Sequence, residues 1–572
     1  MIQSFVYAGT SGVYQQGEAR AIRFAPNLAR EPVAFDAELK HPLRFREAIS
    51  ALHDVVVADL RFAKRDKTAY LQWKQQQGKH DAAVRQAAHE QARQDIAAKA
   101  NLPMPPGFDK EFDQARKIYW SARIGYANYL AKHDPALFRK LMPSDPVITV
   151  ADDVVFFECF SKDESAYGNL SVARDGFGTS SAVQVGTTNV DYSMALYEQF
   201  QTLRTYRQTR FNLDPEAFAV KTTVAEGATG IPSQHREEKI DLPTSWLRGF
   251  MKLQAAMTMP TTRVSLTRDV VYSLLAFLKR HKARKSPRAL RFELEPGQPV
   301  RMVLEPWEKS FIAPMTRYEG PATQPIRIWG TRRLLVLARM LPLADSIDVL
   351  LLATGLPSFW LVRMGEMTFT LGLSGWTTND WAKGSALDML QPPRAPSVEL
   401  IDRTAGVMKS KRSLDLAGVK REVQSQDDHV VAAALRHLAQ SGQVIYDMGA
   451  QRFRYRQIMP QILGEKQLGP EDPELAGARE LIEKKKAQLV DREDGPNLTR
   501  VIIGKVESTP VEILVDADDR IKRGKCLCGH FKKYGLRNGP CRHMIALRWG
   551  ASVQGLSAFE GTGFLNRLMG RN

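Results

Sequence analysis

Hydrophobic positions follow a helical period at the start of the chain. After a short strand-like beginning, Leu52, Val55, Val56 and Leu60 recur at intervals of three and four residues. This spacing places apolar side chains on one face of a helix. We therefore predict that residues 1–144 form a mainly helical N-terminal region.

Residues 145–395 mix helical and strand-like patterns. Helical spacing is found at residues 244–257 and 267–281, and consecutive strand-like runs at 347–353, 359–364 and 367–373. The sequence Glu-Pro-Gly-Gln-Pro between residues 290–294 and 300–304 predicts a hairpin turn. Strands that follow one another without regular intervening helices indicate an α+β domain, not a doubly wound parallel sheet.

The C-terminal third divides into smaller units. Residues 396–462 carry helical patterns at 413–423 and 427–440, then strands at 444–447 and 452–456, which is typical of a winged-helix-like segment. A charged helix at 474–490 predicts a helical connector over residues 463–498. Two strand-like stretches, 500–506 and 511–516, open a β-β-α unit at 499–550, and residues 551–572 form a tail. The expected fold class is thus α+β multidomain.

Three of the four cysteines, Cys526, Cys528 and Cys541, fall within 16 residues of one another. Residues i and i+2 on a strand point to the same side, so Cys526 and Cys528 can reach one ion. Pro540 predicts a helix start that supplies Cys541 and His543. Zn²⁺ prefers four tetrahedral thiolate and imidazole ligands, so the pattern predicts one structural zinc ion with no position open for water.

Two other residues bear on this assignment. His530, two residues after Cys528, is a rival ligand that would break the paired i, i+2 pattern. Cys159 lies in the apolar run 154–160, which predicts a buried, inert thiol. The alternative to a metal site is a chance cluster of buried thiols beside a histidine.

The spacing Cys-x-Cys, twelve residues, Cys-x-His resembles the SWIM zinc finger over about residues 500–550. The matching positions are Cys526, Cys528, Cys541 and His543. The resemblance implies a module that binds DNA or contacts proteins. The whole chain is also similar to bacterial stand-alone SWIM proteins, which implies a MoxR-type AAA+ ATPase and a von Willebrand A-domain protein as partners.

The chain carries a net charge of +17, and the region of the finger is especially basic. Nine Lys or Arg residues and no Asp or Glu occur between Arg520 and Arg548. This excess favours an anionic partner, either DNA or RNA or an acidic protein surface, over a solvated face without a partner. The candidate contacts are Arg523, Lys525, Lys532, Lys533, Arg537 and Arg542, with Arg452 and Arg454 on the predicted hairpin.

Catalytic and targeting motifs are missing from the sequence. It contains no G-x-x-x-x-G-K-[ST] loop, no H-E-x-x-H, no secretory start and no run of about 18 apolar residues. We expect a cytoplasmic protein that does not enter a membrane. Its expected function is that of a zinc-binding, non-enzymatic adaptor. The alternative is an enzyme with an unrecognised active site in residues 145–395 that the finger targets.

Overall fold

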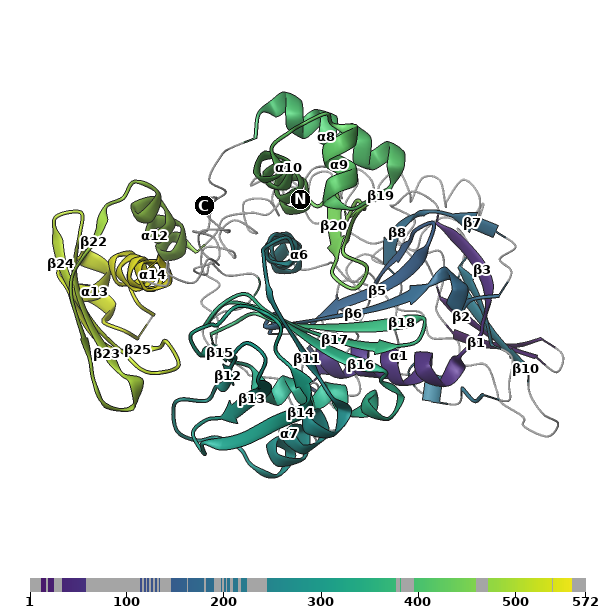
Figure 1. Cartoon of the computed structure of the whole chain (residues 1–572), viewed down its shortest axis with the longest axis horizontal. Helices are drawn as coiled ribbons and strands as arrows, with labels where there is room; N and C mark the ends of the chain where they lie inside the picture. The colour runs from purple at the N-terminus through teal and green to yellow at the C-terminus, as the bar shows by residue number, and fades with distance from the viewer. Residues whose placement is uncertain are drawn as a thin grey trace.

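The computed structural model describes most of the chain from residue 146 onward and parts of the N-terminal region. The described ranges are 33–57, 146–161, 163–178, 182–189, 209–213, 244–376, 396–458, 472–537 and 539–557, with strand backbones at 12–16, 19–24 and 218–223 and single positions elsewhere. Most of the helical pattern predicted for residues 58–144 lies outside these residues. The described chain is a mixed α+β protein with several antiparallel sheets (Figure 1).

An eight-stranded antiparallel sheet forms the centre of the molecule (Figure 1). The predicted consecutive strands are confirmed, because β16, β17 and β18 pair in sequence as a meander. The order across the sheet is β11 (Thr262–Leu266), β16 (Ser346–Leu351), β17 (Ser358–Met364), β18 (Met367–Leu373), β6 (Ala166–Ala173), β5 (Val154–Phe160), β4 (Val147–Val150) and β8 (Gly186–Asn189).

Alternating side chains give this sheet two buried faces. On β17, Trp360 and Val362 belong to the core that contains helix α1 (Pro42–Val57). Their neighbours Phe359 and Leu361 belong to a second core that contains helix α6 (Thr244–Met257). Strand residues point alternately to opposite faces, so one helix covers each side of the sheet. The predicted bounds of α6 are confirmed.

A six-stranded sheet combines strands from residues 12–39 with strands from residues 182–223. Its order is β1 (Gly12–Gln16), β2 (Ala19–Phe24), β10 (Phe218–Thr223), β9 (Thr209–Leu213), β3 (Ala34–Leu39) and β7 (Ala182–Gln184). Buried Phe35, Ala37 and Leu39 alternate with half-buried residues on β3. This short alternation of period two precedes the helical pattern of α1, and the sheet contains strands from both sides of residue 144.

The predicted hairpin is confirmed in a four-stranded sheet. Its order is β14 (Lys309–Arg317), β13 (Pro299–Leu304), β12 (Leu290–Glu293) and β15 (Ile326–Ile328). Helix α7 (Arg268–Arg280) packs its apolar face, including Val271 and Leu275, into the same core. Short 3-10 helices occur at Arg174–Gly176, Thr331–Arg339 and Leu341–Leu343.

Residues 396–458 form a module of three helices and a small sheet. Its order is α8 (Val398–Lys411), β19 (Ser413–Leu414), α9 (Leu416–Glu422), α10 (Asp428–Gln440), β20 (Val444–Asp447) and β21 (Arg452–Tyr455), with the sheet ordered β19-β21-β20. The helix predicted from residue 413 begins at Leu416, because Ser413 and Leu414 pair with β21 and the Asp415 carboxylate accepts the Gly418 N–H. Helix α10 packs against α6.

The C-terminal module is larger than the predicted β-β-α unit. It consists of α12 (Pro473–Glu483), β22 (Ala487–Asp494), η5 (Pro496–Leu498), β23 (Arg500–Val506), β24 (Thr509–Val515), β25 (Ile521–Cys526), α13 (Gly529–Tyr534) and α14 (Arg542–Ser557). The helix predicted to reach residue 490 ends at Glu483, because the chain turns at Lys485 with a φ of 53°. Strand β22 then pairs with β23, and α12 packs on α14. No helix among the described residues is long and apolar enough to cross a membrane.

Candidate metal centre and basic surface

The four predicted ligands come together at the junction of three elements of the C-terminal module. Cys526 ends β25, Cys528 precedes α13, Cys541 precedes α14, and His543 lies in the first turn of α14. One donor atom from each side chain lies within 4.8 Å of all the others. Cys526 and Cys541 are buried, and Cys528 and His543 are half-buried. The four side chains are close enough to bind one metal ion.

The separation between Cys526 and His543 is close to that of two ligands around a tetrahedral ion. The Cys526 Sγ and His543 Nδ1 atoms are 3.8 Å apart. Bond lengths of roughly 2.3 Å to sulfur and 2.0 Å to nitrogen put neighbouring ligand atoms about 3.5 to 3.8 Å apart in a tetrahedron. The other imidazole nitrogen, Nε2, is 3.9 Å from Glu507 Oε2, at the β23–β24 turn. A carboxylate in this position can orient the ring for metal binding through Nδ1.

The charge state of the cluster also suits a cation. A hydrogen bond from Cys541 lowers the pKa of Cys526 to about 4, with a further contribution from His543. The Cys526 sulfur in turn raises the pKa of His543. The pKa of Cys541 is raised because its thiol hydrogen-bonds to Cys526. A bound divalent cation would favour the thiolate form of the three cysteines and the neutral form of the imidazole.

Packing beneath the cluster fixes the position of α14. Met544 and Leu547 are buried against the four-stranded sheet of the C-terminal module, whose order is β22-β23-β24-β25. A Cβ atom at Gly504 would lie 2.2 Å from Leu547 Cδ1, and one at Gly524 would lie 2.7 Å from Met544 Cε. Glycine on strands β23 and β25 thus lets the helix approach the sheet closely.

His530 and Cys159 lie outside the metal cluster. His530 Nδ1 is 3.6 Å from Glu474 Oε1, and this histidine is not part of the four-residue cluster. Cys159 is fully buried, and its Sγ donates to the Leu52 carbonyl oxygen at 3.3 Å. Burial raises the pKa of its thiol above the ordinary value. The prediction of a buried thiol is confirmed.

Carboxylates from outside the basic stretch neutralise part of it. Within the described chain, Lys522 pairs with Asp516, Lys525 with Glu512, Arg542 with Glu474 and Arg548 with Asp519. Four exposed cations have no carboxylate within ion-pair distance among the described residues: Arg523, Lys532, Lys533 and Arg537. The Lys533 ammonium lies 4.9 Å from the centre of the Tyr534 ring. Lys532 and Lys533 lie on helix α13.

The arginines predicted for the hairpin surface point mainly inward. The Arg454 side chain is 4% exposed and pairs with Asp447 at 3.0 Å and with Asp153 on the neighbouring domain. Arg456 is fully buried and pairs with Glu158 on β5. Arg452 is half-buried. Arg454 therefore links this module to the eight-stranded sheet through its ion pairs, and its side chain does not face solvent.

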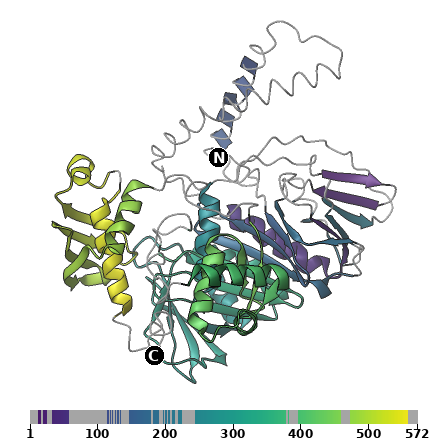
Figure 2. The same ribbon diagram turned by 90° about the horizontal axis from the view of Figure 1, so that it is seen from above.

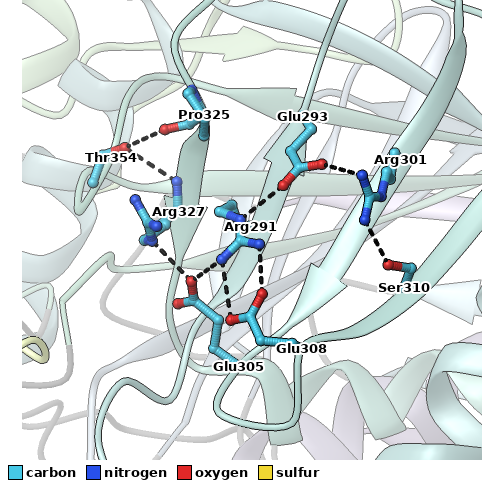
Figure 3. A network of polar contacts seen from close by, with 9 residues as sticks. All are labelled: Arg291, Glu293, Arg301, Glu305, Glu308, Ser310, Pro325, Arg327 and Thr354. Carbon is cyan, nitrogen blue, oxygen red and sulfur yellow. Dashed lines mark hydrogen bonds and ion pairs between the residues drawn. The ribbon is translucent and has the colours of Figure 1, made fainter. Parts of the chain in front are cut away.

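Another group of carboxylates lies at the β14-β13-β12-β15 sheet (Figure 3). Arg291 pairs with Glu293, Glu305 and Glu308, and Arg327 also pairs with Glu305. The hydrogen bond from Arg291 lowers the pKa of Glu308. All three carboxylates accept hydrogen bonds or ion pairs from these guanidinium groups, an arrangement typical of a structural ion-pair network.

A cavity of about 740 Å³ lies between β11 and the loop that follows β14. Its lining includes one carboxylate, Glu319, and two arginines, Arg263 and Arg317. The paired carboxylates expected for general acid and base chemistry do not converge there. The hypothesis of an active site in residues 145–395 thus receives no support from this cavity.

Comparison with known proteins gives little guidance. No family model matches the chain, and no curated protein matches it. Among solved structures, it is similar to the proliferating cellular nuclear antigen of Entamoeba histolytica, with 10% identity over 41% of this chain and 89% of that chain, at a TM-score of 0.29. It is also similar to a structure of the C-terminal region of FEN-1 bound to A. fulgidus PCNA, with 13% identity over 41% and 90% of the two chains, at a TM-score of 0.29. At these scores neither likeness supports an argument about fold or function.

Proposed function

We propose that this chain is a non-enzymatic adaptor whose C-terminal module binds one structural zinc ion and holds an anionic partner. The observation that carries the proposal is the four-residue cluster of Cys526, Cys528, Cys541 and His543, whose donor atoms lie within 4.8 Å of one another. Three thiolates and one imidazole are ligands that Zn²⁺ prefers. Since the protein supplies all four, no coordination position remains for a reacting water.

The motif supports a SWIM-type identity for this module. Its Cys-x-Cys and Cys-x-His pairs lie at a strand end and a helix start, as the resemblance implies. The order of helices and strands in residues 396–458 supports a winged-helix assignment for the neighbouring module. A cytoplasmic location agrees with a site built from reduced cysteines.

The exposed cations near the metal site favour nucleic acid as the partner to test first. Lys532 and Lys533 project from α13 beside the half-buried ring of Tyr534, and Arg523 and Arg537 extend the basic surface. Such residues can contact phosphates while an aromatic ring stacks on a base. Leu527, between two ligands, is 63% exposed and offers an apolar contact. A protein partner remains the second form of the proposal, with a MoxR-type AAA+ ATPase or a von Willebrand A-domain protein as candidates.

Fluorescence anisotropy with single-stranded and double-stranded DNA and RNA tests this proposal. We expect binding at low salt that weakens roughly a hundredfold between about 50 and 200 mM salt, because about four phosphates would be contacted. The double variant Lys532→Glu/Lys533→Glu should weaken binding by about tenfold or more, since two contacts become repulsive.

The matched control is Lys279→Glu/Lys282→Glu, which makes the same charge change at exposed positions near the end of α7. This control should bind nearly as tightly as the wild type. Equal losses in both variants would indicate a response to net charge alone. Absence of binding to every nucleic acid at low salt would rule out the nucleic-acid form and leave an acidic protein surface as the partner.

A further inference from the structure

A second cavity lies where the module of residues 396–458 meets the eight-stranded sheet. Its volume is about 530 Å³, within the range of cavities that hold small organic ligands. Helix α10 forms one wall, strands β16 and β17 form another, and the end of α6 closes a third side. Apolar side chains, among them Met257, Leu361 and Phe453, make up part of its lining.

Most charged groups in the lining already have partners. Asp348 accepts hydrogen bonds from Arg263 and Ser265, both at 2.8 Å, and also pairs with Arg363. Asp428 pairs with Lys420 at 2.6 Å. These groups balance one another, so they neither require nor strongly repel a charged ligand.

Arg436 on α10 differs from them. Its Nε donates a long hydrogen bond, 3.4 Å, to Thr258 Oγ1, while its Nη1 is buried and has no hydrogen-bond partner among the described residues. Burial lowers the pKa of its guanidinium, and no carboxylate offsets this effect. Arg436 as a whole is half-buried. A guanidinium that is partly withdrawn from water without a counterion is unfavourable.

Buried arginines elsewhere in the described chain each have a carboxylate partner. The four that are buried all pair with a carboxylate: Arg333 with Asp163, Arg454 with Asp447 and Asp153, Arg456 with Glu158, and Arg548 with Asp519. Arg436 has no such carboxylate partner among the described residues, and it lines the cavity instead. The unpaired guanidinium and the cavity therefore point to the same missing component, an anion.

We propose that this cavity binds a small organic anion, a phosphate monoester or carboxylate attached to an apolar body. Arg436 binds the anionic group, because a guanidinium offers two parallel N–H donors to a phosphate or carboxylate. Met257, Leu361 and Phe453 contact the apolar body. The site is separate from the metal cluster and does not depend on the function proposed for it.

Titration of the full-length, zinc-loaded protein with phenyl phosphate, followed by saturation-transfer NMR, tests this inference. We expect saturable binding of phenyl phosphate, and much weaker binding of phenol or inorganic phosphate, since each supplies only half of the ligand. Benzoate, which keeps both the ring and an anionic group, should also bind. Failure of both phenyl phosphate and benzoate to bind would overturn the proposal.

Arg436→Met keeps an unbranched side chain of similar length but removes the charge. It should lower the affinity for phenyl phosphate by about tenfold or more. Thermal unfolding of the ligand-free variant should occur at the same temperature as the wild type or higher, because a half-buried charge without a counterion is gone. Arg421→Met, at an exposed position of α9 outside the cavity lining, is the matched control and should bind like the wild type.

A lower unfolding temperature of ligand-free Arg436→Met together with unchanged affinity would assign Arg436 a structural role and contradict the proposal. Zinc content measured on the same samples separates the two sites. If Arg436→Met lost phenyl phosphate binding and kept its full zinc content, the loss would be assigned to the cavity and not to the metal site.

Discussion

At the scale of single residues, two kinds of buried ionisable group can be compared: those paired with an opposite charge and those held neutral. Arg456 and Glu158 represent the first kind, since both are fully buried and lie in contact. His53 on α1 represents the second kind: it is 6% exposed, its ring is 4.4 Å from that of Tyr197, and burial, with a contribution from Arg339, lowers its pKa to about 4. The two kinds respond differently to pH.

His53 should make the protein less stable in mild acid. Between pH 6.5 and 4 the unfolded chain binds a proton at this side chain and the folded chain does not, so the free energy of unfolding falls as the pH falls. The expected loss over this window is about 3 kcal/mol. His53→Phe should remove that part of the pH dependence when unfolding is followed by urea titration at several pH values.

Both proteins in this comparison keep the same zinc ligands, so acid release of the metal affects them equally. If the wild type and His53→Phe lost stability in parallel between pH 6.5 and 4, His53 would be protonated in the folded protein, and our account of it would be wrong.

Residue roles could be predicted from sequence only where partners are close in the chain. Cys526, Cys528, Cys541 and His543 lie within 18 positions, and the strand and helix around them follow from local pattern. The hairpin arginines were interpreted as exposed because their carboxylate partners are distant. Arg454 meets Asp153 across 301 positions, and this contact exists only in the folded chain.

At the scale of secondary-structure elements, a fully buried ion pair joins β5 to the end of the module of residues 396–458. Arg456 follows β21, and Glu158 on β5 also accepts a hydrogen bond from the Tyr167 hydroxyl at 2.5 Å. Helix α10 packs on α6 beside this network. The module of residues 396–458 is therefore anchored to the central sheet by charge as well as by apolar packing.

Removing one partner of this pair should be costly. Glu158→Gln leaves the Arg456 guanidinium buried without a counterion, and we expect a loss of about 3 to 5 kcal/mol in the free energy of unfolding. The double variant Glu158→Gln/Arg456→Met should be more stable than Glu158→Gln alone. Urea unfolding of the wild type, of Glu158→Gln and Arg456→Met alone, and of the double variant gives the coupling energy.

The control is Glu480→Gln, which makes the same change in the exposed pair between Glu480 and Lys484 on α12. It should leave stability nearly unchanged. A similarly small effect of Glu158→Gln would contradict the importance of the buried pair.

Elements with a long, uninterrupted pattern were predicted well, and short ones were not. Helix α6 and the β16-β17-β18 meander each have many apolar residues at one period. Strand β22 was interpreted as part of a helix because its exposed, charged residues show no clear alternation. Its identity comes from pairing with β23, which the local sequence does not specify.

At the scale of the whole molecule, the C-terminal module lies beside the central domain, as Figure 2 shows. Asp518, which is 1% exposed, connects them: it accepts hydrogen bonds from the Arg288 backbone and side chain and from the Trp329 indole. Although burial alone would raise the pKa of Asp518, these donors lower it below its usual range. The Arg500 guanidinium also lies 5.9 Å from the Trp376 ring.

Asp518→Ala should loosen this contact, because the Trp329 and Arg288 donors lose their buried acceptor. We expect a larger radius of gyration in small-angle X-ray scattering and faster hydrogen exchange around Trp329. Glu512→Gln, in an exposed pair of the same module, should change neither quantity. Scattering curves that are identical for Asp518→Ala and the wild type would show that Asp518 does not hold the two parts together.

The metal content of the purified protein tests the central claim most directly. Elemental analysis should find one zinc ion per chain in the wild type and in Cys159→Ala, and much less in Cys541→Ala. Loss of the ion should also loosen the C-terminal module, since zinc binding contributes on the order of 10 kcal/mol to local folding. Cys541→Ala protein with full zinc content, or wild-type protein that binds no zinc, would contradict the account.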